Sequence, residues 1–340
     1  LFKFILILLL YQSPLYSKSK TLDDFNLRYL SNYFSGIVAY DNNDNSEALK
    51  FFKSSRILIK QHESYLEKYI YSLVLEGNVR DATNEIKNNL TENNSNFFEA
   101  QLLLALESLK KKNYKKSKDH LKQSYAFMNN DRISQLIVET LEQYLYVFEE
   151  NKIPNTEKNF GNLSFINEVF QRCYLNDKDT KKYFDKIINN KNDGNYSRYI
   201  FFYINYLIEN NRYDEAREIA DSIDYLNSSL LISQGKKWID DRKLKEFNKI
   251  FSCRNSNDIV SEFLYSIASL YSSQYNYEQS NFYLNISHYL NPKFKFNLSL
   301  MVENYYYNED YSNTSKILKS FNNKADFYHW FKIKKKRKLF

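Results

Sequence analysis

Helix-breaking residues are scarce in this sequence: only 5 glycines and 3 prolines occur among its 340 residues. Turn-rich β-sandwiches and glycine-dependent phosphate loops need more of both, because glycine supplies positive φ angles and proline shapes turns. Their scarcity argues against such folds and favours helices joined by short turns. Hydrophobic residues make up 43% of the chain, including 31 tyrosines and 26 phenylalanines, which is enough for a core. We therefore expect an all-α fold.

Cysteine is scarcer still. The two cysteines, Cys173 and Cys253, lie 80 residues apart and match no metal-ligand or redox spacing. Helix faces at that separation in a repeat array would rarely meet. We therefore expect both side chains to be small buried hydrophobes, although an exported protein could pair them.

Outside a short basic run, the chain has almost no net excess of positive or negative charge. The formal net charge is +7, but six positive charges lie close together at Lys332, Lys334, Lys335, Lys336, Arg337 and Lys338. The remainder is almost neutral and does not make the broad electropositive surface that phosphate binding requires, so we expect no nucleic-acid partner. The run from Lys332 to Lys338 could contact a membrane surface peripherally or an acidic protein, or be the charged flank of a truncated helix.

Motifs that carry chemistry are missing as well. The histidines are isolated from one another and from both cysteines, at His62, His120, His288 and His329. The sequence contains no His-x-x-x-His pair, no Cys-x-x-Cys and no glycine-rich phosphate loop. We expect no catalytic residue, no metal site and no cofactor, and we predict that the chain is not an enzyme.

The N-terminal residues have the layout of a targeting segment. Residues 1–17 combine a basic end at Lys3, an apolar run over residues 4–10 and a polar end that contains Pro14. A secretory signal peptide has this order, and the apolar run is about half of the roughly 20 residues that span a bilayer. We predict a signal peptide over 1–17, a linker over 18–28, and export to the periplasm or cell envelope. An uncleaved anchor is the alternative.

A period of about 34 residues organises the rest of the chain. Its clearest unit has a first helix predicted over 261–273, a turn at 274–276 and a second helix over 277–290. Pro292 closes the unit because proline has no N–H to continue a helix. One position of the second helix always holds a short side chain, which lets two helices approach closely. These residues are Ala48, Ala82, Ser117, Ala216, Ser280 and Thr314.

The chain has small residues at fixed positions and an aromatic residue at the turn. In these features it resembles the tetratricopeptide repeat (TPR) family, in particular exported bacterial TPR proteins. The resemblance covers roughly 29–327, although 132–195 and 229–256 lack the full signature. It implies a right-handed α-solenoid of stacked antiparallel helix pairs, a TPR-like superhelix. We place an N-terminal array at 29–150, a linker at 151–162, a C-terminal array at 163–327, and a basic helical end or truncated repeat at 328–340.

In the family that this chain resembles, the first helix of each pair lines a concave groove in which peptides or helices dock. The partner-binding residues that the resemblance implies are Tyr33, Ile37, Tyr40, Phe201, Asn205, Ile208, Tyr265, Ser269 and Tyr306. The family's basic clamp for a C-terminal carboxylate is not matched, since Tyr33 and Ile37 stand where lysine and asparagine would be expected. Chaperone-tail binding is therefore not expected.

These features predict an exported protein-binding scaffold that presents a concave groove to a protein or peptide partner in the cell envelope. The alternative is the docking or regulatory part of an envelope enzyme, such as cell-wall or polysaccharide machinery, with catalysis in a segment outside this sequence. An enzyme in its own right is the least favoured interpretation.

Overall fold

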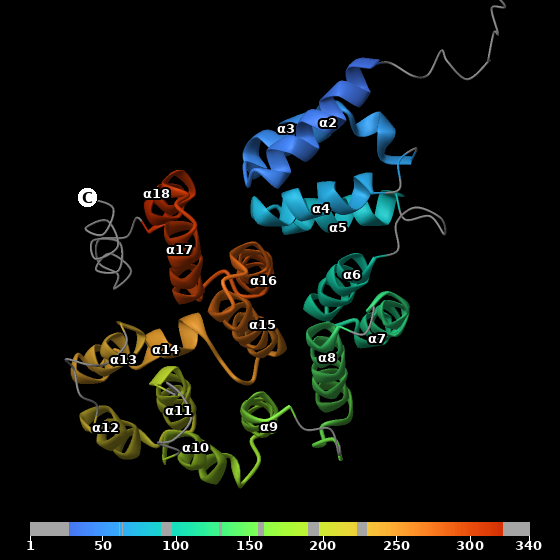
Figure 1. Ribbon diagram of the computed structural model, residues 1–340. Helices are drawn as coiled ribbons and strands as arrows, with labels where there is room; N and C mark the ends of the chain where they lie inside the picture. Colours follow the sequence, from blue (N-terminus) through green and yellow to red (C-terminus); the bar gives the residue numbers. More distant parts are fainter. Residues whose placement is uncertain are drawn as a thin grey trace, which may run out of the picture.

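The computed structural model describes residues 27–60, 62, 64–89, 97–128, 131–155, 160–189, 197–222 and 230–321. Every regular element in these ranges is helical, and none of them contains a strand. The predicted all-α fold is therefore confirmed. Figure 1 shows the helices stacked one after another along a curved path.

Most helices follow one another as pairs joined by short turns. The pairs are α2 (Leu27–Asp41) and α3 (Asn45–Ser54), α4 (Tyr65–Leu75) and α5 (Val79–Asn89), α6 (Phe98–Lys110) and α7 (Tyr114–Ser124), α9 (Asn162–Leu175) and α10 (Thr180–Asn189), α11 (Ser197–Glu209) and α12 (Tyr213–Asp221), α13 (Leu230–Asp240) and α14 (Lys245–Ile250), α15 (Ser256–Ser273) and α16 (Tyr277–Leu290), and α17 (Leu298–Tyr307) and α18 (Tyr311–Ser320). Helix α8 (Arg132–Glu150) stands between the third and fourth pairs, and short 3-10 segments occur at η1 (Arg56–Lys60), η2 (Tyr125–Phe127) and η3 (Lys295–Asn297). Helices α15 and α16 match the unit predicted most clearly, except that α15 begins earlier, at Ser256.

One turn geometry joins the two helices of each of the eight described pairs. The turn contains a residue with positive φ, at Asn43, Gly77, Lys112, Asn176, Asn211, Arg242, Tyr275 and Glu309. The N–H of the next residue donates to a carbonyl five residues earlier, as Asn276 does to Tyr271 at 3.0 Å, which is the Schellman arrangement. An Asp or Asn side chain then caps the second helix of four pairs, at Asp44, Asn113, Asn276 and Asp310.

The small-residue position predicted from the repeat is the fourth residue of the second helix in six of these pairs. Ala48, Ala82, Ser117, Ala216, Ser280 and Thr314 are all at most 1% exposed. The helices of a pair lie close at this position, since the Ser117 hydroxyl donates to the carbonyl of Ala105 on the other helix at 2.8 Å. The sequence period therefore marks a packing contact that recurs along the chain.

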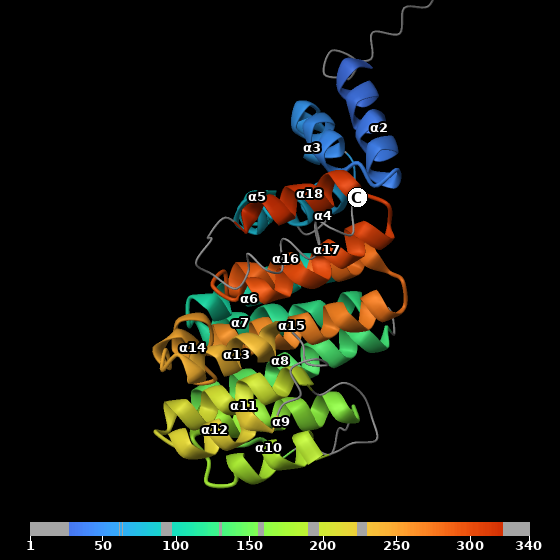
Figure 2. The same ribbon diagram turned by 90° about the vertical axis from the view of Figure 1, so that its left-hand side faces the viewer.

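The stack reverses its direction. Helices α2 to α8 form one arm, which we call the descending arm, and α9 to α14 turn the chain around. Helices α15 to α18, the returning arm, then run back beside the descending arm (Figures 1 and 2). Helix α16 packs against α4 and α5, while α15 packs against α6, α8 and α9. The arms share a core, because the rings of Tyr71 and Phe282 stack with centres 4.7 Å apart.

Polar contacts join the two arms along their length. The Tyr40 hydroxyl donates to Glu278, and Asn285 donates to the carbonyl of Leu75 at 3.2 Å. Further along, the Tyr289 hydroxyl donates to Glu107 at 2.5 Å. Ionic contact continues to the last described helix, where Lys316 pairs with Glu76 at 2.6 Å. The returning arm is therefore fixed against the descending arm by hydrogen bonds and charge as well as by the core.

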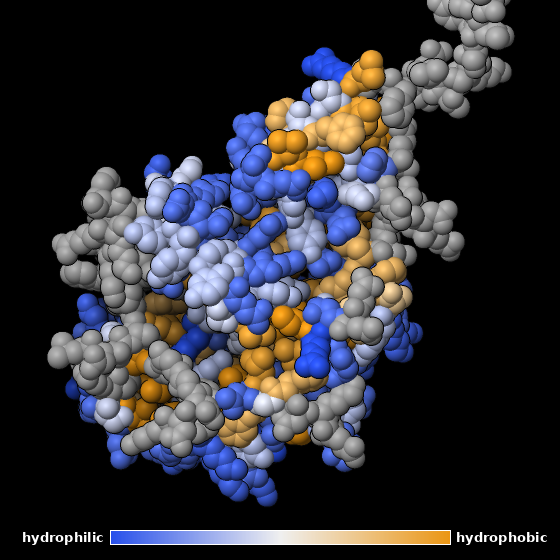
Figure 3. All heavy atoms as spheres, in the orientation of Figure 1, coloured by the Kyte–Doolittle hydropathy of each residue, from blue (hydrophilic) through white to orange (hydrophobic). Residues whose placement is uncertain are grey.

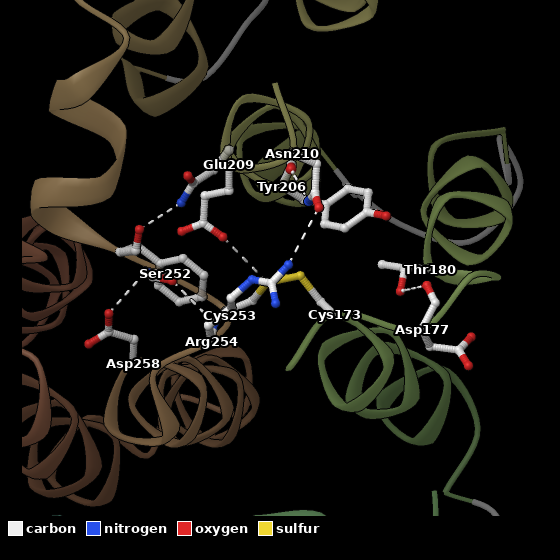
Figure 4. Close-up of a disulfide and its surroundings, with 12 residues drawn as sticks. Cys173, Asp177, Thr180, Tyr206, Glu209, Asn210, Ser252, Cys253, Arg254 and Asp258 are labelled. Atoms are coloured by element: carbon white, nitrogen blue, oxygen red, sulfur yellow. Dashed lines mark hydrogen bonds between the residues drawn. A yellow bond between two sulfur atoms is a disulfide. The ribbon is translucent and has the colours of Figure 1, made fainter. Parts of the chain in front are cut away.

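The prediction that the cysteines stay unpaired is wrong. Cys173, near the end of α9, and Cys253, between α14 and α15, form a disulfide with their Cα atoms 5.8 Å apart (Figure 4). The reversal of the chain is the reason, because it brings the start of α15 against α9. Hydrogen bonds hold the segment around Cys253, since the Ser252 N–H donates to Asp258 at 2.9 Å. The expected burial is observed, as the cysteines are 1% and 4% exposed.

Several predictions fall outside the described residues. These are the signal peptide at 1–17, most of the linker at 18–28, and the basic end at 328–340 with its run from Lys332 to Lys338. The linker predicted at 151–162 lies between the end of α8 and the start of α9. Among the helices described here, none has the length and apolar character needed to span a bilayer.

Candidate functional site

Two of the first helices of the descending arm, α4 and α6, which the TPR resemblance assigns to partner binding, pack against the returning arm, and α2 reaches it through Tyr40. Tyr33 is 1% exposed, and its hydroxyl lies 3.1 Å from Nδ1 of His62. Ile37 packs partly against the core, and the half-buried Tyr40 donates to Glu278 of α16. These three side chains therefore make contacts within the chain itself.

The residues predicted in the 197–230 unit are buried. Phe201, Asn205 and Ile208 are 0%, 1% and 5% exposed. Asn205 donates to the carbonyl of Phe251 at 2.7 Å, because the chain segment that follows α14 returns to α11. A side chain buried inside its own chain cannot contact a partner in this conformation. Sequence reasoning placed these residues on an open face because it could not foresee the reversal of the stack.

The residues predicted in the returning arm differ among themselves. The Tyr265 ring lies under the guanidinium of Arg198, 3.7 Å from the ring centre. Ser269 donates to the carbonyl of Tyr265 at 3.0 Å, within its own helix. Tyr306, at the end of α17, is half-buried and belongs to a group of tyrosines on the surface.

We call this group the tyrosine ladder; it consists of Tyr275, Tyr277, Tyr306, Tyr307 and Tyr311. The rings contact one another in the order Tyr275, Tyr277, Tyr307, Tyr306 and Tyr311, with ring centres 5.8–6.4 Å apart. Only Tyr277 and Tyr307 stack, and the other three contacts are edge-to-face. Tyr275, Tyr307 and Tyr311 are 80%, 61% and 54% exposed, so their side chains are open to solvent. Exposed tyrosines bury a large area on binding at a low cost in side-chain entropy, which makes the ladder the candidate functional site.

The repeat explains why five rings gather here. Tyr275 lies in the turn between α15 and α16, and Tyr277 is the first residue of α16. Tyr306 and Tyr307 end α17, and Tyr311 begins α18. Because the two helix pairs stack side by side, their turns lie on the same edge of the returning arm. In Figure 3 the surface over α16 to α18 is pale to blue, the colour range of tyrosine and charged residues.

Tyr275 adopts an uncommon backbone conformation for its residue type. Its φ is 62°, in the left-handed region, which costs an L-residue roughly 1–2 kcal/mol. The equivalent position holds Asn or Gly in some turns, at Asn43, Gly77 and Asn211, and ordinary L-residues in others, at Lys112, Arg242 and Glu309. The positive φ is therefore a property of the turn. The side chain of Tyr275 is 80% exposed and gains little from packing to offset the strain.

Carboxylates lie around the ladder. Glu278 follows Tyr277, while Glu309 and Asp310 lie between Tyr307 and Tyr311 in the sequence. Burial raises the pKa of the neighbouring Tyr305 well above its ordinary value, and the charges of Glu76, Asp310 and Glu278 raise it further. Glu278 accepts from the Tyr40 hydroxyl, and Asp310 accepts from the Asn313 N–H at 2.9 Å, so two of these carboxylates already have partners in the chain.

Elsewhere the chain pairs tyrosine rings with cations. Arg198 lies over Tyr265 and Lys110 over Tyr289, with the charged groups 3.7 and 3.4 Å from the ring centres. In both places a carboxylate is close by: Glu262 binds Arg198, and Glu107 accepts from the Tyr289 hydroxyl. No cation from the described part of the chain lies over a ring of the ladder.

A cavity between the arms adjoins the ladder. It has a volume of about 440 Å³ and is lined by Tyr40, Glu67, Lys68 and Tyr71 of the descending arm and by Asn276 and Glu278 at the start of α16. Its lining therefore carries both acidic and basic side chains, and Asn276 and Glu278 flank Tyr277 in the sequence. In the described ranges no group of three or more His, Cys, Asp or Glu side chains is placed to hold a metal ion.

A second exposed surface is apolar. Phe34 and Val38 on α2 are 53% and 59% exposed and line a depression of about 670 Å³ with Phe51 of α3. In Figure 3 orange surface gathers over α2. This face lies at the outer end of the descending arm, where α2 and α3 have no preceding described pair to pack against.

A scan against models of known protein families finds no match, and a search of curated proteins finds no similar sequence. The argument for a function therefore depends on the residues of this chain.

Sequence reasoning predicted two residues of the ladder, Tyr306 and Tyr307, as groove residues and missed Tyr275, Tyr277 and Tyr311 as site residues. A signal for them exists, because tyrosine recurs at the first position of the second helix, at Tyr114, Tyr213, Tyr277 and Tyr311. Whether such a residue packs inward or stays exposed depends on neighbouring pairs, which the sequence pattern alone does not specify.

Proposed function

We propose that this protein is an exported, TPR-like scaffold of the cell envelope that binds a partner protein or peptide through the tyrosine ladder. The observation that carries the proposal is the series of five contacting tyrosines, three of them more than half exposed, on a chain whose other large aromatic side chains mostly lie in the core. This proposal assigns binding rather than catalysis to the protein.

The repeat pattern supports the TPR-like part of the proposal. Six pairs share one turn geometry and one buried small residue, as expected for a superhelix built from similar units. We also propose that these pairs form the right-handed superhelix of the TPR family. The returning arm covers α4 and α6 of the descending arm, so the proposed contact surface moves from the groove to the turns of α15 to α18.

The disulfide supports the proposed location. Structural disulfides persist in oxidising compartments and are rare where thiols are kept reduced. The Cys173–Cys253 bond is therefore consistent with export, as is the signal-peptide layout of residues 1–17.

The test compares three forms of the protein expressed in its native envelope and crosslinked there. The first is the parent. The second, the ladder variant, carries Tyr275→Ala, Tyr307→Ala and Tyr311→Ala, all at exposed rings. The third is a matched control with Tyr125→Ala, Tyr146→Ala and Tyr213→Ala, whose rings are 41%, 38% and 47% exposed elsewhere.

The proposal expects one protein to be captured by the parent and the control but not by the ladder variant. That protein, once purified, should bind the parent directly and the ladder variant at least 10-fold more weakly. Equal binding of the ladder variant and the parent would refute the ladder as the contact surface.

A further inference from the structure

Helix α2 presents an exposed apolar face at the outer end of the descending arm (Figure 3). We propose that two copies of this protein associate through this face, with their α2 helices crossing in antiparallel directions about a two-fold axis near Phe34 and Ser35. Two features of α2 select a second copy of the chain as the occupant: its pattern of large and small side chains and the positions of its charged residues. Neither involves the tyrosine ladder.

The exposed face of α2 has a row of large side chains beside a row of small ones. Phe34 and Val38 are 53% and 59% exposed and form the raised row. Ser31, Ser35 and Ala39, which are also spaced four residues apart, form a low row next to it, because residues three apart are neighbours on a helix. In the commonest class of helix packing, rows with this spacing on one helix fit into the grooves between such rows on the other.

The low row lines the depression of about 670 Å³ that α2 shares with Phe51 of α3. A second copy related by a two-fold axis places its raised row over this low row, and its own low row receives Phe34 and Val38 in return. A two-fold contact requires such a match of a surface to itself, because both copies use the same patch. Any apolar partner could cover the raised row, whereas the matching low row beside it favours a second copy.

The charges of α2 favour the antiparallel direction. The 15 residues of this helix include two charged side chains, Arg28 in the first turn and Asp41 at the last position, and both are exposed. Arg28 and Asp41 are equally far in sequence from the proposed centre of the crossing. An antiparallel crossing therefore brings Arg28 of one copy to the same end as Asp41 of the other, while a parallel crossing brings like charges together.

Asp41 can take part in this contact while it keeps its neighbour in the chain. Its carboxylate lies 3.8 Å from Nζ of Lys68, and 62% of its side chain stays exposed. The contact as a whole is small, because each copy contributes mainly one helix, so we expect a weak dimer. Such a dimer carries two tyrosine ladders and can engage a partner that offers two binding segments.

The first test measures the mass of the full chain against its concentration by analytical ultracentrifugation. The parent should pass from monomer to dimer between about 1 and about 500 µM, the range of a weak contact. The double variant Phe34→Ser and Val38→Ser should raise the Kd of the dimer at least about 30-fold, because two apolar side chains per copy leave the contact. The matched control Ile57→Ser changes a side chain that is 55% exposed and does not line the depression, so its Kd should equal that of the parent.

The second test determines the direction of the two helices by thiol crosslinking. Both native cysteines are in the disulfide, so an introduced cysteine supplies the single free thiol of each copy. Ser35→Cys lies next to the proposed two-fold axis and should form a crosslinked dimer on mild oxidation. Arg28→Cys should crosslink when it is mixed with Asp41→Cys but not with itself. Crosslinking of Arg28→Cys to itself would show a parallel contact and overturn the proposed arrangement.

Three other results would overturn the proposal. The first is a parent that stays monomeric at every concentration. The second is a double variant that has the helical circular dichroism of the parent and dimerises as tightly, because the contact would then lie elsewhere. The third is a dimer that appears only after residues 1–26 are removed, because the chain's own N-terminal segment would then be the occupant. The ladder variant should dimerise like the parent, so failure of this proposal leaves the proposed function untouched.

Discussion

Removing the disulfide should destabilise this protein more than any exposed substitution. The bond closes a segment of 80 residues between Cys173 and Cys253. In the chain-entropy account, closing a loop of that length removes about 15 cal/mol/K from the unfolded ensemble, or about 4.5 kcal/mol at 25 °C. Measured effects usually fall below this value, so we expect the double variant Cys173→Ala and Cys253→Ala to lose about 2–4.5 kcal/mol. Alanine keeps the buried sites free of unpaired polar atoms.

The assay is urea unfolding followed by circular dichroism, with and without a reductant. The parent should unfold at lower urea when reduced, and the double variant should unfold at the same urea concentration in both conditions. Alkylation of the denatured, unreduced parent should modify neither cysteine. A loss below about 1 kcal/mol would refute the loop-entropy reasoning, and two alkylated thiols in the parent would refute the disulfide itself.

Three other substitutions test the packing, the charges and the strain. Arg198→Met should lower the free energy of unfolding, measured in urea, by about 3–5 kcal/mol, because it leaves the 1%-exposed Glu262 charged and unpaired. Adding Glu262→Leu should restore most of this loss. The absence of any restoration would contradict the pairing. Burial raises the pKa of Asp258 to about 7, so the folded state keeps a proton that the unfolded chain releases near pH 4. The stability that this group contributes therefore falls as pH rises from about 4 to about 7. Between pH 5 and pH 8 the parent should lose free energy of unfolding, and Asp258→Asn should remove about 1–3 kcal/mol of that loss. An unchanged pH dependence in the variant would exclude Asp258 as its source. Tyr275→Asn should raise the free energy of unfolding by about 0.5–1 kcal/mol, since asparagine tolerates a φ of 62° better; destabilisation would show that the ring stabilises the fold.

Local features of the fold follow from the sequence. The period that places a short side chain at Ala48, Ala82 and their equivalents identifies six helix pairs, because a helix pair packs closely only where side chains are small. Turn residues such as Asn276 and Asp310 mark where second helices begin, since their side chains cap the first N–H groups. These signals act over a few residues and are therefore visible in the sequence.

The tertiary structure decides which helix pairs, far apart in the sequence, contact one another. A small change in the angle between successive pairs, which no single residue specifies, determines whether the stack stays open or turns back on itself. That reversal buries Phe201 and Asn205, joins Cys173 to Cys253, and covers α4 and α6 of the descending arm. Sequence patterning reports which face of a helix is apolar, but it does not report whether that face meets a partner or another part of the same chain. The tyrosine ladder stays exposed because its turns lie on the edge of the returning arm, outside the contact between the two arms.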